Sequence, residues 1–299
     1  MEQFSIITDS CSDLDRNTRE RYGIEYLPMR ILFEDRDLPA SLDWEQISAA
    51  EFYRLMRDGV RIRTSQINAA EYREAFEKCV SEGRGVLSIS CSSALSSSYR
   101  GSLVAREEVL KKYPDAQIFC IDSRNACMGL GILCMTAADM RAEGRTLSET
   151  AAYLEAHKQE VNQFCTVESL TYLKRAGRVS ATSAVFGGLL QVKPIIISDV
   201  NGQNVAVEKV KGRRASFLRV AELFGEAYRR APYQRICIVH ADCEADAEAL
   251  KELVLEKLPD RDVEVRTDLI GPIIGASTGP GTVAVYSYGK EVTFDGAKA

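Results

Sequence analysis

The sequence lacks the patterns that several large classes of protein require. No apolar run approaches the roughly 20 residues that cross a bilayer, and only two of the 299 residues are histidine. The nine cysteines include no Cys-x-x-Cys pair, and an odd count without a secretion signal is typical of reduced, buried thiols. We therefore expect neither a membrane-spanning segment nor a metal site.

The chain also lacks an excess of basic residues and a secretion signal. Its net charge is −5, with Lys and Arg interspersed among Asp and Glu. A protein that binds nucleic acid needs a basic face that neutralises phosphates. Residues 1–4 contain neither the basic region nor the apolar stretch of a signal peptide. These features predict a cytoplasmic protein with no nucleic-acid partner.

Common nucleotide-binding motifs are absent as well. The sequence has no Gly-x-x-x-x-Gly-Lys-Ser/Thr loop and no Gly-x-Gly-x-x-Gly turn after a strand. One enzymatic alternative remains, a hydrolase or transferase. In it Asp242 orients His240, and His240 activates Ser96 or Ser277. Because nothing closer to these serines supplies a strong base, the pattern favours binding over catalysis.

Strand and helix patterns alternate through the first half of the chain. Buried strands are predicted near residues 4–8, 86–90 and 118–121, with helices between and after them. Asn68 with Glu71 forms a capping box for one helix, and an earlier helix is predicted to begin at Asp43. This alternation is typical of a parallel or mixed sheet covered by helices.

We therefore predict an α/β protein of two domains, because 299 residues exceed one ordinary core. Residues 1–160 form an N-terminal parallel or mixed sheet flanked by helices. Residues 161–299 form a C-terminal α+β unit, in which Asn201-Gly202 joins two strands as a hairpin. The ligand is expected in the cleft between the domains, since such sheets bind ligands at the carboxyl ends of their strands.

Three segments rich in small residues lie beside strongly apolar stretches: residues 8–14, 92–99 and 271–281. Hydroxyl groups and open backbone amides at strand-to-helix turns are suited to holding an anion. In the second segment, Ser96 and the amide of Ser97 are expected to face the cleft. The alternative is that these serines only cap a helix. The third segment, with its many glycines, is predicted as a loop.

Thr64 and two basic turns complete the candidates. Asn68 caps the helix after Thr64, which leaves the Thr64 hydroxyl free for a ligand; the alternative is that it satisfies local backbone amides. The basic turns are residues 174–178 and 209–214. Most charge runs are solvated faces, but in an acidic protein two basic loops could steer one acidic partner.

Motifs along the whole chain resemble those of the DegV family, whose members include the fatty-acid-binding subunits of bacterial fatty acid kinase. Each motif is weak by itself, but seven in the right order over nearly the full length are specific. They are Ile7-Thr8-Asp9-Ser10, Thr64-Ser65-Gln66, Ser92-Ser93-Ala94-Leu95-Ser96, Asp122-Ser123, Leu173-Lys174-Arg175-Ala176-Gly177-Arg178-Val179-Ser180, Lys193-Pro194-Ile195, and Gly271-Pro272 through Gly279-Pro280-Gly281.

The resemblance implies that a long-chain fatty acid is bound between two α/β domains, with no cofactor. Hydroxyl groups hold its carboxylate; by position these are Thr64 and Ser96, assisted by the backbone of Ser97. Ser277 and Thr278 of the third segment join this candidate set. A separate ATP-binding kinase subunit then phosphorylates the bound acid to an acyl phosphate, so this chain is a lipid-binding carrier in phospholipid metabolism and not itself an enzyme.

The resemblance also implies a tunnel for the alkyl chain and a docking surface for the kinase subunit. Arg178 falls in the segment associated with docking. Each methylene buried in such a tunnel contributes about 0.8 kcal/mol. Four apolar residues are candidates for the tunnel wall, although ordinary core packing explains them equally well: Val185, Phe186, Leu189 and Leu190. Peripheral or transient contact with a membrane is left open.

The chain departs from the family pattern at two places. Ser97 and Ser98 stand where the family usually has Gly and Thr, and Ser277 stands where it usually has His. A serine donates a hydrogen bond but cannot carry positive charge or relay a proton near neutral pH. Lipid binding survives this change more easily than coupling to a kinase does. A carrier of another anionic amphiphile, without a kinase partner, is therefore a further alternative.

Overall fold

The computed structural model describes residues 4–181, 192–259 and 262–298. Its strands are β1 (Phe4–Asp9), β2 (Ile24–Leu27), β3 (Arg30–Phe33), β4 (Arg36–Pro39), β5 (Arg63–Ser65), β6 (Gly85–Ser90), β7 (Ile118–Asp122), β8 (Val161–Thr166), β9 (Ser180–Ala181), β10 (Val192–Ser198), β11 (Asn204–Lys211), β12 (Ile236–His240), β13 (Val265–Leu269) and β14 (Val283–Tyr288). Its helices are α1 (Arg16–Tyr22), α2 (Ala49–Arg57), α3 (Ala69–Ser81), α4 (Ser98–Lys112), α5 (Met128–Ala142), α6 (Leu147–His157), α7 (Thr171–Ala176), α8 (Arg213–Ala227), α9 (Glu244–Lys257) and α10 (Pro272–Thr278), with short 3-10 helices at Ser10–Ser12 and Lys158–Glu160.

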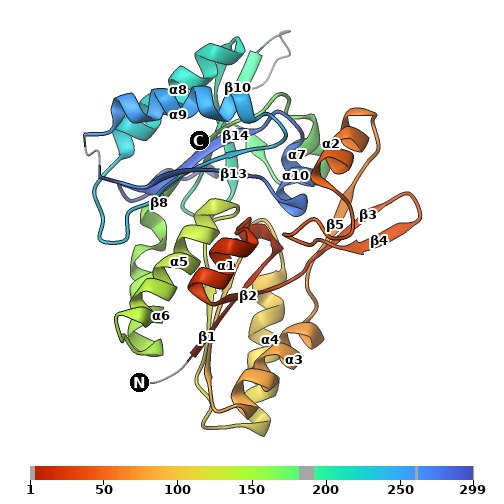
Figure 1. Cartoon of the computed structure of the whole chain (residues 1–299), viewed down its shortest axis with the longest axis vertical. Coiled ribbons are helices and arrows are strands. Elements are labelled where there is room, and N and C mark those ends of the chain that lie inside the picture. Colours follow the sequence, from red (N-terminus) through yellow and green to blue (C-terminus); the bar gives the residue numbers. More distant parts are fainter. Residues whose placement is uncertain (1–3, 182–191, 260–261, 299) are drawn as a thin grey trace.

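The described strands form three sheets (Figure 1). The first is four-stranded, in the order β2-β1-β6-β7, and all its neighbouring strands are parallel. The second is three-stranded and antiparallel, in the order β4-β3-β5. The third is seven-stranded and mixed, in the order β13-β12-β14-β8-β10-β11-β9. The predicted α/β class, with a parallel sheet followed by a mixed one, is confirmed.

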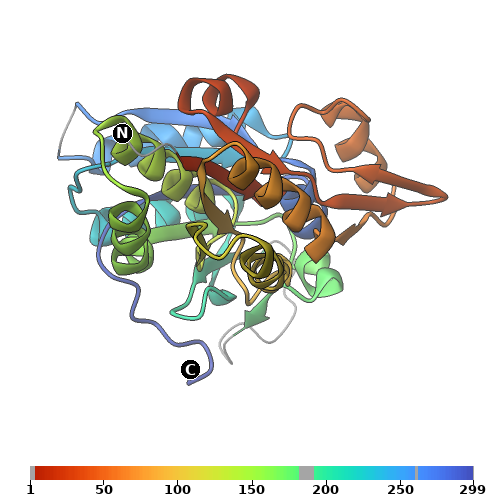
Figure 2. The same cartoon turned by 90° about the horizontal axis from the view of Figure 1, so that it is seen from below.

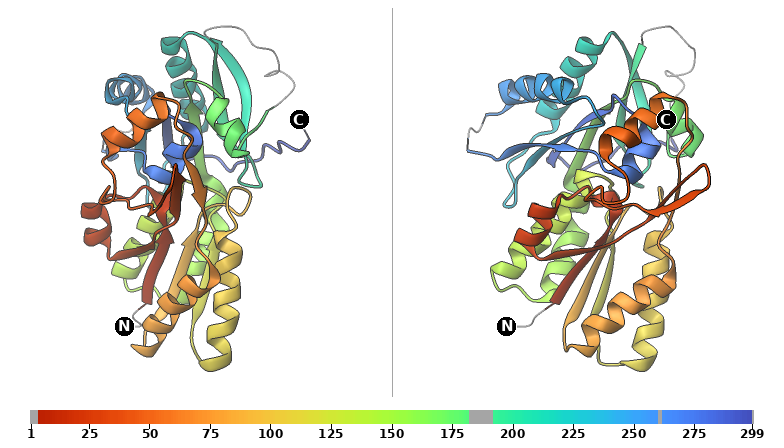
Figure 3. Two further views of the ribbon diagram at one scale, coloured as in Figure 1. Left: turned by 90° about the vertical axis from the view of Figure 1, so that its right-hand side faces the viewer. Right: turned by 45° about the vertical axis from the view of Figure 1, so that its right-hand side comes forward.

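The four-stranded sheet and the seven-stranded sheet lie one beyond the other along the long axis of the molecule (Figure 3). Helices α3 and α4 pack on the four-stranded sheet, as do α5 and α6, while α8 and α9 pack on the seven-stranded sheet. The hairpin of β3 and β4 extends away from the body, as the view from below also shows (Figure 2). In the same views, the strands of the four-stranded sheet point with their carboxyl ends toward the seven-stranded sheet (Figures 1 and 3).

Helix α5 connects the two sheets through its packing. It contacts β1 and β6 of the first sheet and β8 and β14 of the other. Twelve of its 15 residues are buried, which is typical of a helix that is enclosed on all sides. One hydrophobic cluster accordingly contains residues of both halves, from Ile6 and Leu87 to Cys165 and Tyr286. The strands change sheets near residue 160, but the division into domains 1–160 and 161–299 stays a prediction.

Local sequence signals account for several element boundaries. The capping box is present, because Asn68 accepts from the backbone of Glu71 and the Glu71 side chain accepts from the backbone of Asn68. The Asn201-Gly202 hairpin joins β10 and β11 as predicted. Asp43, however, does not cap α2. The hydroxyl of Ser48 does so, since Asp43 is held in ion pairs with two arginines of α1.

The third small-residue segment is also not the predicted loop throughout. Pro272–Thr278 form helix α10, with Pro272 in its first turn. Proline is favoured at the start of a helix because its missing N–H has no partner there in any case. Only Gly279 and Gly281, with φ of 84° and 83°, make the turn into β14. Ser277 and Thr278 are therefore helical residues.

The carboxylate of Asp9 links the ends of β1 and β6. Its Oδ1 accepts a hydrogen bond from the backbone of Cys11 at 2.8 Å, and its Oδ2 accepts one from the backbone of Cys91 at 2.8 Å. Burial raises the pKa of Asp9 to about 6, and these backbone hydrogen bonds oppose the shift. Strand order reverses between β1 and β6, which is where open parallel sheets bind ligands. Asp9 therefore fixes both loops at that point.

We expect Asp9→Ala to lower the free energy of unfolding by roughly 2–5 kcal/mol, because it leaves two buried N–H groups without an acceptor. Asp15→Ala is the matched control. Asp15 caps the exposed start of α1, so its loss should cost only about 1 kcal/mol. Urea unfolding of both variants measures the difference. Equal losses would mean that Asp9 acts only as an ordinary cap.

Candidate functional site

A cavity of about 590 Å³ lies at the carboxyl edge of the four-stranded sheet. The loops that follow β1, β6 and β7 line one side, and residues of β8, β10 and β14 line the other. Helix α10 and strand β5 complete the wall. Its size falls within the roughly 300–1,000 Å³ of sites that enclose small organic ligands. The cavity is formed by both halves of the chain, where the sequence predicts a cleft.

The five residues predicted to hold a carboxylate line this one cavity: Thr64, Ser96, Ser97, Ser277 and Thr278. They come from β5, from the loop before α4 and from α10, which are far apart in the sequence. Among the described residues of the lining, none is Asp or Glu, and Arg178 is the only cationic side chain. Their grouping makes them candidates, and their role in binding stays a prediction.

The hydroxyl groups in this set differ in whether their single proton is already used. Ser96 Oγ donates to Ser98 Oγ at 3.0 Å and accepts from the Ser98 backbone at 3.2 Å. Ser277 and Thr278 donate to backbone carbonyls one turn earlier in α10, at 3.2 and 3.0 Å. The Thr64 and Ser97 hydroxyls make no hydrogen bond with the described part of the chain. Within this set, these two hydroxyls are therefore the ones most ready to donate to an anion.

The rest of the cavity wall is largely apolar. Four thiols belong to it, and burial raises the pKa of Cys165 to about 12 and the pKa of Cys127 well above its ordinary value. These thiols are neutral at pH 7 and behave as small apolar groups. The other aliphatic lining residues are Met29, Ala94, Leu95, Ala126, Leu173, Ile196, Ile270, Ile273, Ile274 and Ala284.

The residues predicted for a tunnel wall lie outside the described residues: Val185, Phe186, Leu189 and Leu190. They stay a prediction. The apolar wall was not predicted from the sequence, because its members come from many separate segments of the chain. Ala94, Leu95, Leu173, Ile273 and Ile274 fall within motifs, but nothing in their spacing indicates that they share a surface.

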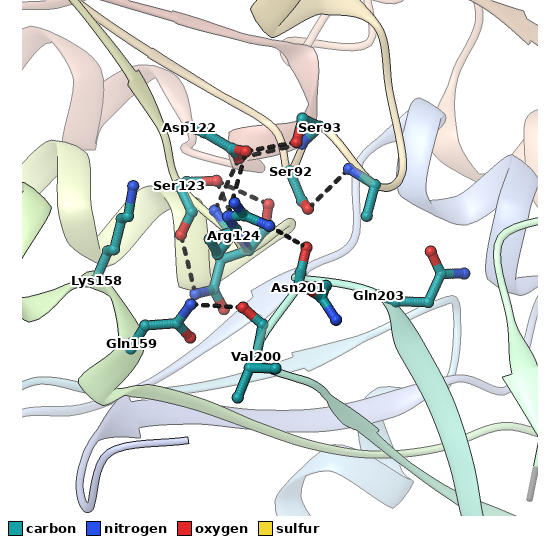
Figure 4. Close-up of polar contacts among 12 residues, drawn as sticks. Ser92, Ser93, Asp122, Ser123, Arg124, Lys158, Gln159, Val200, Asn201 and Gln203 are labelled. Carbon is teal, nitrogen blue, oxygen red and sulfur yellow. Dashed lines mark hydrogen bonds and ion pairs between the residues drawn. The ribbon is translucent and has the colours of Figure 1, made fainter. Parts of the chain in front are cut away.

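Figure 4 shows how the serine loop, residues 91–97, is anchored to the end of β7. Asp122 accepts hydrogen bonds from the backbone of Ser93 at 3.1 Å and from its hydroxyl at 2.5 Å. The guanidinium of Arg124 lies 3.4 Å from the same carboxylate. The Asp122-Ser123 motif thus positions the loop that contains Ser96 and Ser97.

The hairpin between β10 and β11 packs against the serine loop and the end of β7 from the other sheet (Figure 4). Arg124 donates to the carbonyl of Asn201 at 2.9 Å, and Gln159 donates to the carbonyl of Val200 at 2.7 Å. Gly202 has a φ of 74° and lies so close that an added Cβ would stand 2.8 Å from the Arg124 Cα. Glycine is therefore required at this turn. The sequence predicts the hairpin but gives no signal of this contact.

Arg178 lies at the rim of the cavity, with an exposed side chain. Its Nε donates to the carbonyl of Leu95 at 3.1 Å, and Nη1 donates to the carbonyl of Ala176. Arg178 thereby joins the segment after α7 to the serine loop. Its predicted role in docking a partner is a separate matter and stays a prediction.

The arrangement on which the hydrolase or transferase alternative depends is not formed. His240 is not part of the cavity lining, and its Nδ1 faces the backbone N–H of Cys243 at 3.3 Å. Asp242, which was to orient His240, forms an ion pair with Arg57 instead. Burial lowers the pKa of His240. Within the described residues, neither Ser96 nor Ser277 has a histidine partner.

The described residues contain neither a group of metal ligands nor a membrane-spanning helix. Within residues 4–181, 192–259 and 262–298, no three His, Cys, Asp or Glu side chains are grouped so that they could hold a metal ion. In the same ranges, no helix combines the length and apolar character needed to cross a membrane. All nine cysteines are free, and seven of them are buried, as the sequence predicts.

Comparison with known proteins identifies the family. The family described as "Uncharacterised protein, DegV family" matches residues 3–290 of this chain. The chain belongs to the DegV family. A DegV domain-containing protein of Clostridium perfringens is 38% identical over 289 residues, which cover 97% of this chain and 98% of that protein. The resemblance based on the seven motifs is therefore confirmed.

Solved structures of other DegV proteins share the fold. A structure that reports fatty acid binding of a DegV family protein from Thermus thermophilus has a TM-score of 0.84 and 27% identity, covering 96% of this chain and 99% of that one. A DegV lipid binding protein from Thermotoga maritima has a TM-score of 0.83 and 25% identity, covering 97% and 100%. The neighbours of this DegV protein in fold are thus lipid-binding and fatty-acid-binding proteins.

Asp13 is an acidic group buried directly beside the cavity wall. Neither of its carboxylate oxygens finds a hydrogen bond within the described residues that meets normal geometry. The cavity-lining Cys127 and the backbone of Gly271 lie next to it. Burial raises the pKa of Asp13 to about 8, so the carboxyl keeps its proton at neutral pH.

We expect Asp13→Asn to change the pH dependence of stability. The pKa of the Asp13 carboxyl is 3.8 in the unfolded chain and about 8 in the folded protein. Between these values only the folded state keeps the proton, so this group lowers stability as pH rises. The variant should lose that decline and gain roughly 1–4 kcal/mol in free energy of unfolding at pH 8. Urea unfolding between pH 5 and pH 9 tests it; parallel curves would contradict a buried, protonated Asp13.

Proposed function

We propose that this DegV protein binds a long-chain fatty acid, with the carboxylate beside Thr64 and the alkyl chain along the apolar wall. The observation that carries the proposal is the lining of one cavity. Hydroxyl-bearing residues from three segments face the same space as neutral thiols and aliphatic side chains. The relatives from Thermus thermophilus and Thermotoga maritima, described as fatty acid binding and lipid binding, support it.

The physical chemistry of the cavity suits an ionised amphiphile with one charge. A carboxylate needs donors at its head, and Thr64 and Ser97 of the cavity lining offer hydroxyl protons that no described residue uses. The alkyl chain needs only apolar surface, and each buried methylene contributes about 0.8 kcal/mol. The absence of Asp and Glu from the described lining removes charge repulsion with the carboxylate.

We further propose that the protein is a carrier for a separate kinase subunit. A carboxylate oxygen of the bound acid forms a bond to the γ-phosphorus of ATP, and the bond from that phosphorus to ADP breaks, so that ADP leaves with the electron pair. This chain supplies the bound acid and a docking surface that includes Arg178; the nucleotide belongs to the partner. In this role it acts in the cytoplasm, in phospholipid metabolism, with residues 1–160 and 161–299 as its two domains.

The direct test is the identity of the molecule that accompanies the purified protein. We expect denaturing extraction and mass spectrometry to find about one long-chain fatty acid per chain. Protein that is empty and also fails to bind added palmitate or oleate would overturn the proposal. Recovery of a different anionic lipid would favour the alternative carrier, an outcome to which the uncharged Ser277 at the usual His position lends weight.

We expect Thr64→Val to weaken palmitate binding about tenfold, because one hydrogen bond to a charged group contributes roughly 1.5 kcal/mol. Its thermal stability should stay unchanged, since the hydroxyl has no partner within the described chain. Thr278→Val is the matched control at the same cavity, where the hydroxyl proton is already used on a helix carbonyl. Calorimetric titration and thermal melting test both variants. Equal losses of affinity would exclude a special role for Thr64.

A further inference from the structure

A second cavity, of about 470 Å³, adjoins the first. Thr64, Arg178 and Ser277 line both cavities. The remaining wall of the second cavity comes from the segment between α2 and β5 on one side and from α7 on the other. The two cavities therefore meet at the residues proposed to surround the fatty-acid carboxylate.

Arginine dominates the second cavity, which we call the arginine pocket. Its lining contains Arg57, Arg61, Arg63, Arg175 and Arg178. Among the described residues around it, none is Asp or Glu. The whole chain is acidic, with a net charge of −5, so five guanidinium groups around one space are not a consequence of composition. Like charges in close proximity repel, and an anion between them removes that cost.

Three of these arginines lack partners. Arg61, Arg63 and Arg175 are exposed, and none of them forms a hydrogen bond or ion pair with residues that the structure describes. Arg57, by contrast, has an ion pair with an aspartate between β12 and α9. Arg178 donates to two backbone carbonyls. The pocket thus keeps at least three guanidinium groups available for a ligand.

The second basic turn, residues 209–214, differs from this arrangement. None of its residues lines either cavity. Arg213 is paired with Asp246 at 2.8 Å and also donates to the carbonyl of Gly281. The charge of Arg213 therefore serves packing within the seven-stranded-sheet half. Free positive charge next to the proposed head-group site is specific to the arginine pocket.

We propose that the arginine pocket holds a phosphoryl group directly beside the fatty-acid head group. The inference rests on the proposed function. Guanidinium groups present planar pairs of donors that match phosphate oxygens, and several of them suit a dianion. A carboxylate carries one charge and lies within the first cavity. A phosphoryl group on that carboxylate extends past Thr64, into the cavity that Arg61, Arg63 and Arg175 line.

Two sources can supply this phosphoryl group. One is the acyl phosphate itself, and the other is the terminal phosphate of ATP when it approaches the bound acid. Both present the same tetrahedral anion at the same place. An acidic surface of a protein partner is a different occupant, which needs neither the cavity nor its junction with Thr64. Titration with a lipid phosphonate, with a nucleotide and with charge variants separates these three cases.

The probe is a long-chain β-ketophosphonate, in which a methylene replaces the bridging oxygen of palmitoyl phosphate. Wild-type protein is titrated with this probe and with palmitate. The triple variant Arg61→Gln/Arg63→Gln/Arg175→Gln should bind the ketophosphonate at least about tenfold more weakly, because it loses charge-assisted hydrogen bonds. Its affinity for palmitate should stay within about twofold of wild type, since the hydroxyl groups and the apolar wall are unchanged.

A charge-matched control is Arg145→Gln/Arg214→Gln/Arg229→Gln. These three side chains are exposed and line neither cavity. The control should bind both ligands as wild type does. An equal loss of ketophosphonate affinity in both triple variants would show an effect of net charge alone and would overturn the proposal.

The remaining outcomes separate this inference from the proposed function. If wild type binds palmitate and the arginine variant binds the ketophosphonate as tightly as wild type does, only the phosphoryl site is overturned. The arginines then serve to bind an acidic partner. Binding of neither lipid by wild type overturns the proposed function. In that case ATP and pyrophosphate are titrated without lipid, as a test of the arginine pocket by itself. Binding that is lost in the arginine variant and kept in the control supports a nucleotide as the source of the phosphoryl group. If neither compound binds to wild type, the proposed phosphoryl site is overturned.

Discussion

The carboxylate of Asp9 is the contact on which the site depends. β1 and β6 are parallel neighbours whose chains leave in different directions, so nothing in the strand pairing itself holds the following loops together. Two backbone hydrogen bonds to one buried carboxylate do so. Both donors, Cys11 and Cys91, line the cavity. Hydrogen bonds to a charged acceptor are strong enough to offset much of the cost of burying it, and the serine loop starts at one of them.

From that point the wall is built by contacts between sheets. Asp122 holds the serine loop from the end of β7, and Arg124 ties the same region to the β10–β11 hairpin. Helix α10 contributes two hydroxyl groups whose protons are already engaged with its own carbonyls. The result is a wall whose polar groups are mostly satisfied internally. Such a wall has few donors to offer, so the proposed recognition depends largely on the unused hydroxyl protons of Thr64 and Ser97.

Local signals in the sequence were enough for the elements that depend on local chemistry. The capping box at Asn68 and the turn at Gly202 follow from side chains within a few residues of the element they shape. The features that the sequence did not predict depend on contacts between segments that are distant in the chain. Asp43 has the right residue type for a cap but is drawn into ion pairs with α1, and the burial of Asp13 arises only when α5 and α10 pack around it. The motifs indicated which residues meet at the cavity, but not which hydroxyl keeps a free proton.

In the proposed function, affinity and discrimination come from different parts of the molecule. A fatty acid and its acyl phosphate have the same alkyl chain, so the apolar wall stabilises both equally and cannot distinguish them. Thr64 can donate to a carbonyl oxygen of either head group. The difference between the two ligands is a phosphoryl dianion, and within the described chain the unpaired positive charge beside the cavity is concentrated at Arg61, Arg63 and Arg175. In such a carrier the apolar wall binds the alkyl chain of the ligand. The arginines distinguish the fatty acid from its acyl phosphate by the charge of the head group.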